Sequence, residues 1–149
     1  AIARLTDAFC IGGTKCGALF GEAVVFPKPD TVPHFFTIIK QNGALLAKGR
    51  VLGIQFDTLF TDGLYERGGA HAVAMADRIR AALTEKGYHL AVDNPTNQIF
   101  LALDAARLAR LSEHVVMGFW EKQDDVTVMR IATSWATREE DVERLIALL

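Results

Sequence analysis

Apolar residues along the chain gather into short runs and helical stripes that predict alternating strands and helices. Residues 8–11 and 18–26 form two apolar runs around a pair of glycines, which predicts a strand, a glycine turn and a second strand. Over residues 33–66 the apolar side chains recur at helical spacing but are broken by glycines, so one interrupted helix or two helices are expected. A cleaner apolar stripe over residues 72–83 predicts a further helix, and Gly87 is placed to end it.

The last sixty residues follow a different rhythm, with shorter apolar runs separated by turn-forming residues. Four strands are expected, at residues 88–92, 98–103, 115–120 and 126–133. Asp104 is placed to cap a short helix, and Thr137 with Glu140 matches a capping box for a final helix. The order strand, strand, helix, strand, strand, helix predicts an α/β (α+β) fold, with a small antiparallel sheet and helices on one face.

Charge, hydropathy and residue spacing argue against several kinds of partner and site. Its 149 residues carry 16 Lys and Arg against 18 Asp and Glu, so a nucleic-acid-binding surface is not expected. No run of residues is apolar for long enough to predict a membrane span. Cys10 and Cys16 match neither a disulfide framework nor a metal clip, and the four histidines lack ligand spacing. We therefore expect a cytoplasmic protein without a metal site, and the start at Ala1 suggests a fragment.

Lys15 is the first candidate for chemistry because glycines and small residues surround it in the segment GGTKCGA. Such a segment lets a planar ligand approach the backbone, and a lysine with a lowered pKa can form a Schiff base with a carbonyl compound. A solvated turn lysine is the plain alternative. A phosphate-binding loop is a poorer one, because its lysine directly follows a glycine and precedes Ser or Thr.

Arg130 is the second candidate because strand alternation places it on the same face as Val128 and Ala132. A guanidinium on an apolar strand face requires an anion, and its planar fork suits the carboxylate of a small amino acid. The alternatives are a structural salt bridge with a nearby acidic residue and a position on the solvent side. Lys40 and Arg50 belong to a basic stretch, and most such stretches are solvated faces.

Two segments of the chain closely resemble one known enzyme family. Residues 11–25 read IGGTKCGALFGEAVV, and residues 130–142 contain RIATSW followed by TREEDV. Both resemble segments of the low-specificity L-threonine aldolases, which belong to the β-eliminating lyase group of fold-type I pyridoxal-phosphate enzymes. The resemblance implies that residues 1–86 form the end of the large cofactor-binding domain and residues 87–149 a small C-terminal α/β domain.

The same resemblance assigns roles to individual residues. It implies that Lys15 carries pyridoxal 5'-phosphate as a Schiff base and that Arg130 binds the α-carboxylate of the amino-acid substrate. The reaction it implies is retro-aldol cleavage of β-hydroxy-α-amino acids, which converts L-threonine to glycine and acetaldehyde. A homodimer or homotetramer would follow from membership in the family.

Further cofactor contacts are implied at four other positions. Thr14 and Gly13 would line the cofactor, whereas Lys40 and Arg50 would lie near its phosphate or near a neighbouring subunit's site. The family motif His-x-Asp-Gly-Ala-Arg, whose Asp pairs with the pyridine nitrogen, is absent from this chain. The chain thus resembles the C-terminal part of such an enzyme, and a non-catalytic α+β binding or assembly module is the alternative function.

Overall fold

The computed structural model describes residues 2–149, and the chain divides into two compact units, Ala1–Tyr65 and Glu66–Leu149. The long helix α3 (Leu64–Glu85) begins at this boundary, and its apolar stripe packs within the second unit. The family resemblance implies a division between two enzyme domains after residue 86, and this division stays a prediction.

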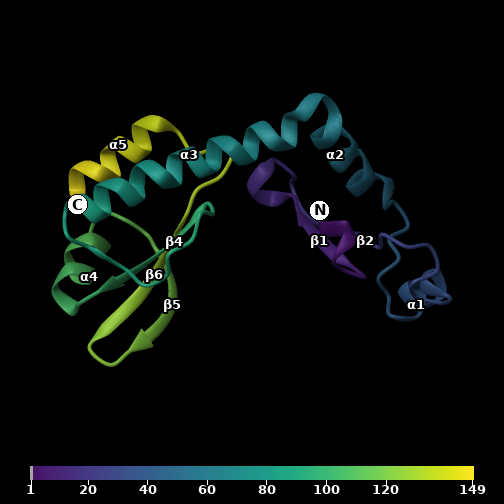
Figure 1. Ribbon diagram of the computed structural model, residues 1–149, viewed down its shortest axis with the longest axis horizontal. Coiled ribbons are helices and arrows are strands. Elements are labelled where there is room, and N and C mark those ends of the chain that lie inside the picture. The colour runs from purple at the N-terminus through teal and green to yellow at the C-terminus, as the bar shows by residue number, and fades with distance from the viewer. Residues whose placement is uncertain (1) are drawn as a thin grey trace. The chain divides into compact units, whose positions relative to one another are not determined.

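The first unit contains a two-stranded antiparallel sheet and two helices (Figure 1). Strand β1 (Phe9–Gly12) pairs with β2 (Glu22–Val25), and the 3-10 helix η2 (Thr14–Cys16) lies in the connection. The second strand is shorter than predicted because Gly17 and Gly21 have positive φ angles, 117° and 88°, which interrupt extended backbone.

Two helices, rather than one interrupted helix, occupy the middle of the chain. They are α1 (Phe35–Gln41) and α2 (Arg50–Phe60). Gly43 follows α1 with a φ of 67°, a left-handed conformation that ends the helix, whereas Gly53 lies inside α2. Of the glycines in this stretch, Gly43 therefore separates the two helices, whereas Gly53 is accommodated within a helix.

The second unit is built on a four-stranded antiparallel sheet with the strand order β3-β4-β6-β5. Its strands are β3 (His89–Leu90), β4 (Gln98–Leu103), β5 (Gly118–Gln123) and β6 (Val126–Ala132). Helices α4 (Ala105–Ser112) and α5 (Glu139–Leu148) complete it. The mixed α/β (α+β) class with a small antiparallel sheet is confirmed.

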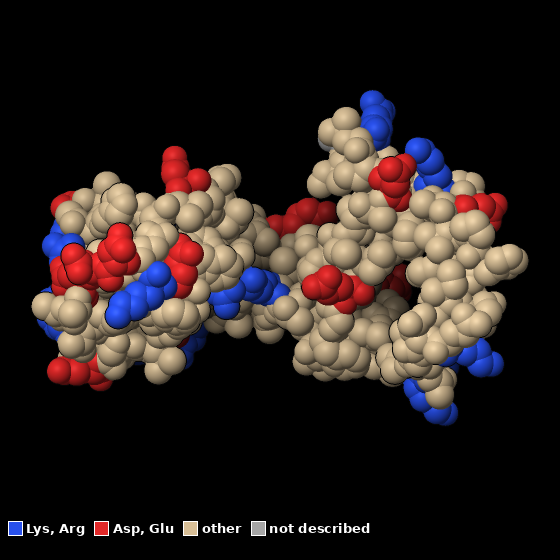
Figure 2. Space-filling view, turned by 90° about the horizontal axis from the view of Figure 1, so that it is seen from below, with Lys and Arg blue, Asp and Glu red and all other residues tan. Residues whose placement is uncertain are grey.

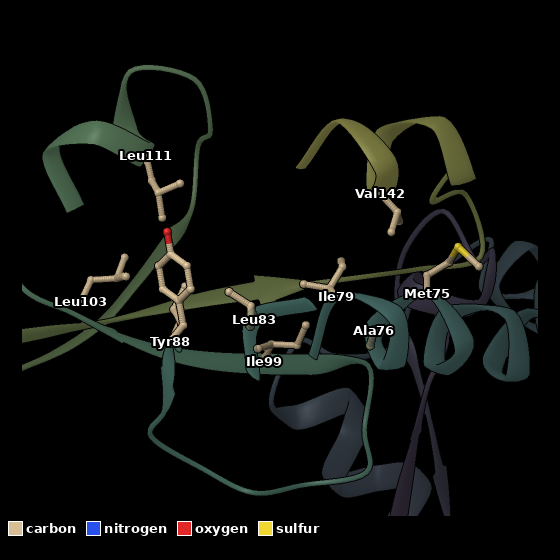
Figure 3. Close-up of a cluster of buried hydrophobic side chains, with 10 residues drawn as sticks. Met75, Ala76, Ile79, Leu83, Tyr88, Ile99, Leu103, Leu111 and Val142 are labelled. Carbon is tan, nitrogen blue, oxygen red and sulfur yellow. The ribbon is translucent and has the colours of Figure 1, made fainter. Parts of the chain in front are cut away.

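The hydrophobic core of the second unit lies between this sheet and its helices (Figure 3). Burial alternates along β4, where Ile99, Leu101 and Leu103 are at most 1% exposed. Their side chains face α3, from which Ile79 and Leu83 enter the same cluster. Figure 1 shows α3 and α5 on one side of the sheet, as the pattern predicts. Each fully buried aliphatic side chain contributes about 1.5–3 kcal/mol of transfer free energy.

The two predicted helix caps have different outcomes. The Asp104 side chain accepts a hydrogen bond from the Arg107 backbone amide at 2.8 Å, so the cap of α4 is confirmed. The predicted capping box at α5 is wrong, because Thr137 Oγ1 accepts from the Ser134 amide instead. Arg138 occupies the cap position without a side-chain bond, and the acidic first turn of α5 interacts favourably with the helix dipole.

The charged side chains of the second unit are mixed in sign. Figure 2 shows acidic and basic residues close together on the face that it displays. None of the helices described between residues 2 and 149 has the length and apolarity needed to cross a membrane. The same residues contain no group of three or more His, Cys, Asp or Glu that could hold a metal ion.

Candidate functional site

The turn that carries Lys15 is shaped by its small residues. The Cys16 amide donates to the Gly13 carbonyl oxygen at 2.9 Å, and the Ala18 amide donates to the same oxygen at 2.9 Å. A Cβ atom added at Gly13 would lie 2.6 Å from the Ala18 Cβ, so no side chain fits there. Gly17 ends η2 with a φ of 117°, which a larger residue rarely adopts. Gly13 and Gly17 are therefore required by the turn itself.

Two polar side chains from later helices form hydrogen bonds with the backbone of this turn. The Gln55 side-chain oxygen accepts from the Leu19 amide at 2.6 Å and from the Phe20 amide at 3.4 Å. The Tyr65 hydroxyl donates to the Gly12 carbonyl oxygen at 2.9 Å, just before the turn. The backbone on both sides of Lys15 is thus connected to α2 and to the start of α3.

The Lys15 side chain is exposed, as is that of Thr14. No hydrogen bond or ion pair joins the Lys15 ammonium to any other residue in the 2–149 range. A held backbone with an unpaired amine suits covalent capture of an aldehyde, because little has to reorganise when the ligand arrives. A solvated turn lysine would have the same exposure, so the cofactor role stays a prediction.

Lys40 and Arg50 lie in the first unit, like Lys15. Lys40 is in the last turn of α1, Arg50 is the first residue of α2, and both side chains are exposed. Within the described part of the chain, no ion pair or side-chain hydrogen bond connects either residue to the Lys15 turn. Their place near the cofactor phosphate stays a prediction.

Arg130 lies in β6 of the second unit, between Phe100 of β4 and Gly118 of β5 in the strand register. Its side chain is half-buried, and its Nη1 donates to Gln98 Oε1 at 3.4 Å. The guanidinium carbon lies 5.9 Å from the centroid of the Trp120 ring. No Asp or Glu among residues 2–149 forms an ion pair with Arg130, so the structural salt bridge considered from the sequence is not found in this range.

Several residues around the two candidates were missed by reasoning from the sequence. Gln55 and Tyr65 contact the Lys15 turn across 36 and 53 positions, and Trp120 reaches Arg130 from a neighbouring strand. Local periodicity carries no signal for such contacts, because it reports only which face of an element a side chain occupies. A hairpin register would have been needed to pair Trp120 with Arg130.

The segment that follows Arg130 is fastened to α3 by buried polar contacts. Thr133 is 2% exposed, and its hydroxyl donates to the Ala72 carbonyl oxygen at 2.6 Å. The Thr133 amide donates to the Asn97 carbonyl oxygen at 3.0 Å, and the His71 ring nitrogen lies 2.7 Å from the Thr137 carbonyl oxygen. These bonds fix the end of β6, and so the strand position of Arg130.

Arg138 and Asp141, at the start of α5, perturb each other's pKa values. A hydrogen bond from the Arg138 guanidinium at 2.9 Å lowers the pKa of the Asp141 carboxyl. The same bond raises the pKa of Arg138. Both groups are at the surface, so this pair bears on the pH dependence of stability rather than on the candidate chemistry.

Two curated proteins with similar sequences carry the same description. The chain is 31% identical over 147 residues, 95% of its length, to a low-specificity L-threonine aldolase of Pseudomonas sp. (strain NCIMB 10558). It is 33% identical over 107 residues, 70% of its length, to a low-specificity L-threonine aldolase of Pseudomonas aeruginosa. No family model matches the chain. The matches cover 40% and 31% of those two proteins, so the chain spans less than half of their length.

Solved structures give the same result for the fold. The threonine aldolase of Leishmania major superposes with a TM-score of 0.91 at 42% identity, over 99% of this chain and 43% of that one. The serine palmitoyltransferase of Sphingomonas wittichii superposes with a TM-score of 0.70 at 15% identity, over 97% of this chain and 39% of that one, which shows a shared fold alone. The predicted resemblance is confirmed, and the chain belongs to the low-specificity L-threonine aldolase group, of which it matches the C-terminal part.

Proposed function

We propose that this chain is the C-terminal part of a pyridoxal-phosphate-dependent lyase that cleaves β-hydroxy-α-amino acids such as L-threonine. The observation that carries the proposal is Lys15, an exposed amine without a partner among residues 2–149, on a turn whose backbone Gln55 and Tyr65 hold. The threonine aldolase of Leishmania major, 42% identical over 99% of this chain, supports the same reaction.

The residues around Lys15 fit a planar aldehyde cofactor. The Lys15 amine and the Thr14 side chain next to it are exposed, and Gly13 before them is packed against Ala18 and Phe56. In the proposed enzyme Lys15 binds the cofactor covalently, Thr14 and Gly13 line it, and Lys40 and Arg50 serve its phosphate. When bound, pyridoxal 5'-phosphate withdraws electrons from the substrate α-carbon as the Cα–Cβ bond breaks.

Arg130 is proposed to bind the substrate α-carboxylate. Arg130 is half-buried and lacks a carboxylate partner in the described chain, which supports a role in binding an external anion. Two parallel hydrogen bonds from its fork would fix the orientation of the substrate and so the direction of the Cα–Cβ bond. Cleavage of that bond in L-threonine yields glycine and acetaldehyde.

We also propose a cytoplasmic homodimer or homotetramer. Large apolar side chains of the first unit are exposed, including Leu19 at 84%, Phe36 at 64% and Ile54 at 55%. Exposed apolar surface of this kind supports burial against further protein. The two free cysteines are compatible with a reducing compartment. Light scattering on the full-length protein that contains this chain measures the subunit number, and a monomer would contradict the proposed assembly.

The decisive experiment for the cofactor role replaces Lys15 in the full-length protein. We expect Lys15→Ala to lose the visible absorbance of bound cofactor and the formation of glycine from L-threonine, because the covalent attachment is removed. Lys28→Ala is the matched control, since Lys28 is an exposed lysine of the same unit whose pair with Asp7 at 3.2 Å is a surface ion pair.

Borohydride reduction followed by peptide mapping identifies the modified lysine directly. A cofactor adduct on Lys15 in the wild type supports the assignment. An adduct on another lysine, or unchanged absorbance in Lys15→Ala, would contradict it. A full-length protein that binds no cofactor at all would favour the non-catalytic binding or assembly module.

A further inference from the structure

Arg130 projects from the face of the sheet opposite the hydrophobic core. Its chain neighbours Met129 and Ile131 pack against the core cluster, and successive side chains of a strand point to opposite faces. In β4, Phe100 is paired with Arg130 and lies between the buried Ile99 and Leu101. Phe100 and Arg130 therefore share the face of the sheet opposite the core cluster.

A bulge in β5 adds an aromatic ring to this face. Phe119 pairs with Met129 and Glu121 pairs with Val128, so Trp120 is the extra residue of the bulge. Bulges redirect side chains and bend the strand that carries them. The Trp120 and Phe100 rings meet edge to face, with centroids 4.9 Å apart and planes at 68°. Because β6 lies between β5 and β4, this aromatic contact spans the strand of Arg130.

The guanidinium of Arg130 is held by two of these neighbours. Its carbon lies 5.9 Å from the Trp120 centroid, within the range of a cation–π interaction, and one Nη1 hydrogen is directed to Gln98 Oε1. Gly118 stands opposite Arg130, and a Cβ added there would lie 3.7 Å from Nε. This is an ordinary van der Waals distance, so residue 118 borders the Arg130 side chain closely.

This arrangement leaves much of the fork unused. A guanidinium has five N–H donors, and one of them is bonded to Gln98. No carboxylate among residues 2–149 takes up the others. Side chains that restrain a guanidinium in advance reduce the entropy lost when it forms two parallel bonds to a carboxylate.

We propose that Trp120, Phe100 and Gln98 are positioning residues for Arg130. Trp120 restrains the guanidinium, Phe100 supports the Trp120 ring, and Gln98 fixes one edge of the fork, so that the remaining N–H groups meet the substrate carboxylate. The inference rests on the proposed function of Arg130 and extends it to residues that contact the substrate only through Arg130.

The test compares two ligands that differ in the carboxylate, using the full-length protein with its cofactor bound. Glycine carries the α-carboxylate and ethanolamine lacks it, and the cofactor absorbance reports the dissociation constant of each. We expect Trp120→Ala to weaken glycine binding about fivefold, the factor expected of an exposed cation–π contact, and to leave ethanolamine binding unchanged. Trp120→Phe keeps an aromatic face and should restore most of the glycine affinity.

Phe119→Ala is the matched control, because Phe119 is an aromatic residue of the same strand, 66% exposed, next to Trp120. Thermal unfolding of each variant separates a positioning effect from loss of the fold. For L-threonine, Trp120→Ala should raise KM by more than it lowers kcat, since binding of the carboxylate is what weakens.

The outcomes separate this inference from the proposed function. If Arg130→Lys weakens glycine binding but Trp120→Ala behaves like Phe119→Ala, the positioning role is wrong and the carboxylate role of Arg130 stands. If Arg130→Lys leaves glycine binding unchanged, both fail. Equal weakening of glycine and ethanolamine in Trp120→Ala would show that Trp120 serves the fold or the cofactor, and would overturn the positioning role.

Discussion

Gln55 offers a direct test of how the Lys15 turn is held in place. Its side-chain oxygen accepts from the Leu19 amide at 2.6 Å and from the Phe20 amide at 3.4 Å, and its nitrogen donates to the Phe20 carbonyl at 3.5 Å. The first bond is worth about 1 kcal/mol, and the two long ones together add about half as much. We therefore expect Gln55→Ala to destabilise the turn by about 1.5 kcal/mol, or about tenfold in its local opening equilibrium.

Amide hydrogen exchange of the 149-residue chain measures this opening residue by residue. The Leu19 amide should exchange about tenfold faster in Gln55→Ala, while core amides of the second unit keep their rates. Gln41→Ala is the control, because Gln41 is an exposed glutamine at the end of α1 in the same unit. Unchanged Leu19 exchange in Gln55→Ala would refute the claim that Gln55 holds the turn, and an equal effect of Gln41→Ala would show general loosening of the unit.

Four further predictions concern the chain and its stability. The 149-residue chain alone should bind pyridoxal 5'-phosphate weakly and not cleave L-threonine, because it lacks the family motif that pairs with the pyridine nitrogen; robust cleavage would contradict this. In the same chain, amides of residues 43–53 should exchange fastest. The bond to Arg138 lowers the folded pKa of Asp141, so its stabilising effect is present above the unfolded value of about 3.9 and is lost as pH falls further. Urea unfolding should therefore show that the free energy of unfolding falls less below pH 4 in Asp141→Asn than in the wild type. Equal pH dependence of the two proteins would contradict a stabilising role for the Asp141–Arg138 pair. Leu101 is 0% exposed, and Leu101→Ala should cost about 2–5 kcal/mol of unfolding free energy in the second unit, with a cost below 1 kcal/mol contradicting its place in the core.

The elements of the chain follow from local patterns where a strong period or a specific cap is present. The stripe on α3 and the alternation of β4 predict their own buried faces, because helical and extended backbones return side chains to one side at fixed intervals. Asp104 caps α4 as predicted, since an N-cap depends only on residues within one turn. Thr137 fails the same test because its hydroxyl has a competing partner in the Ser134 amide, and that competition depends on the path of the preceding loop.

Lys15, Arg130 and the family could be identified from the sequence alone. Lys15 and Arg130 stand out by residue type and neighbours, and the segments around them carry the resemblance that the relatives confirm. The residues that hold each of them could be found only in the folded chain, because Gln55 lies 40 positions from Lys15 and Trp120 reaches Arg130 through a bulged register. Such contacts depend on strand pairing and helix packing, which bring together residues whose separation along the chain carries no period.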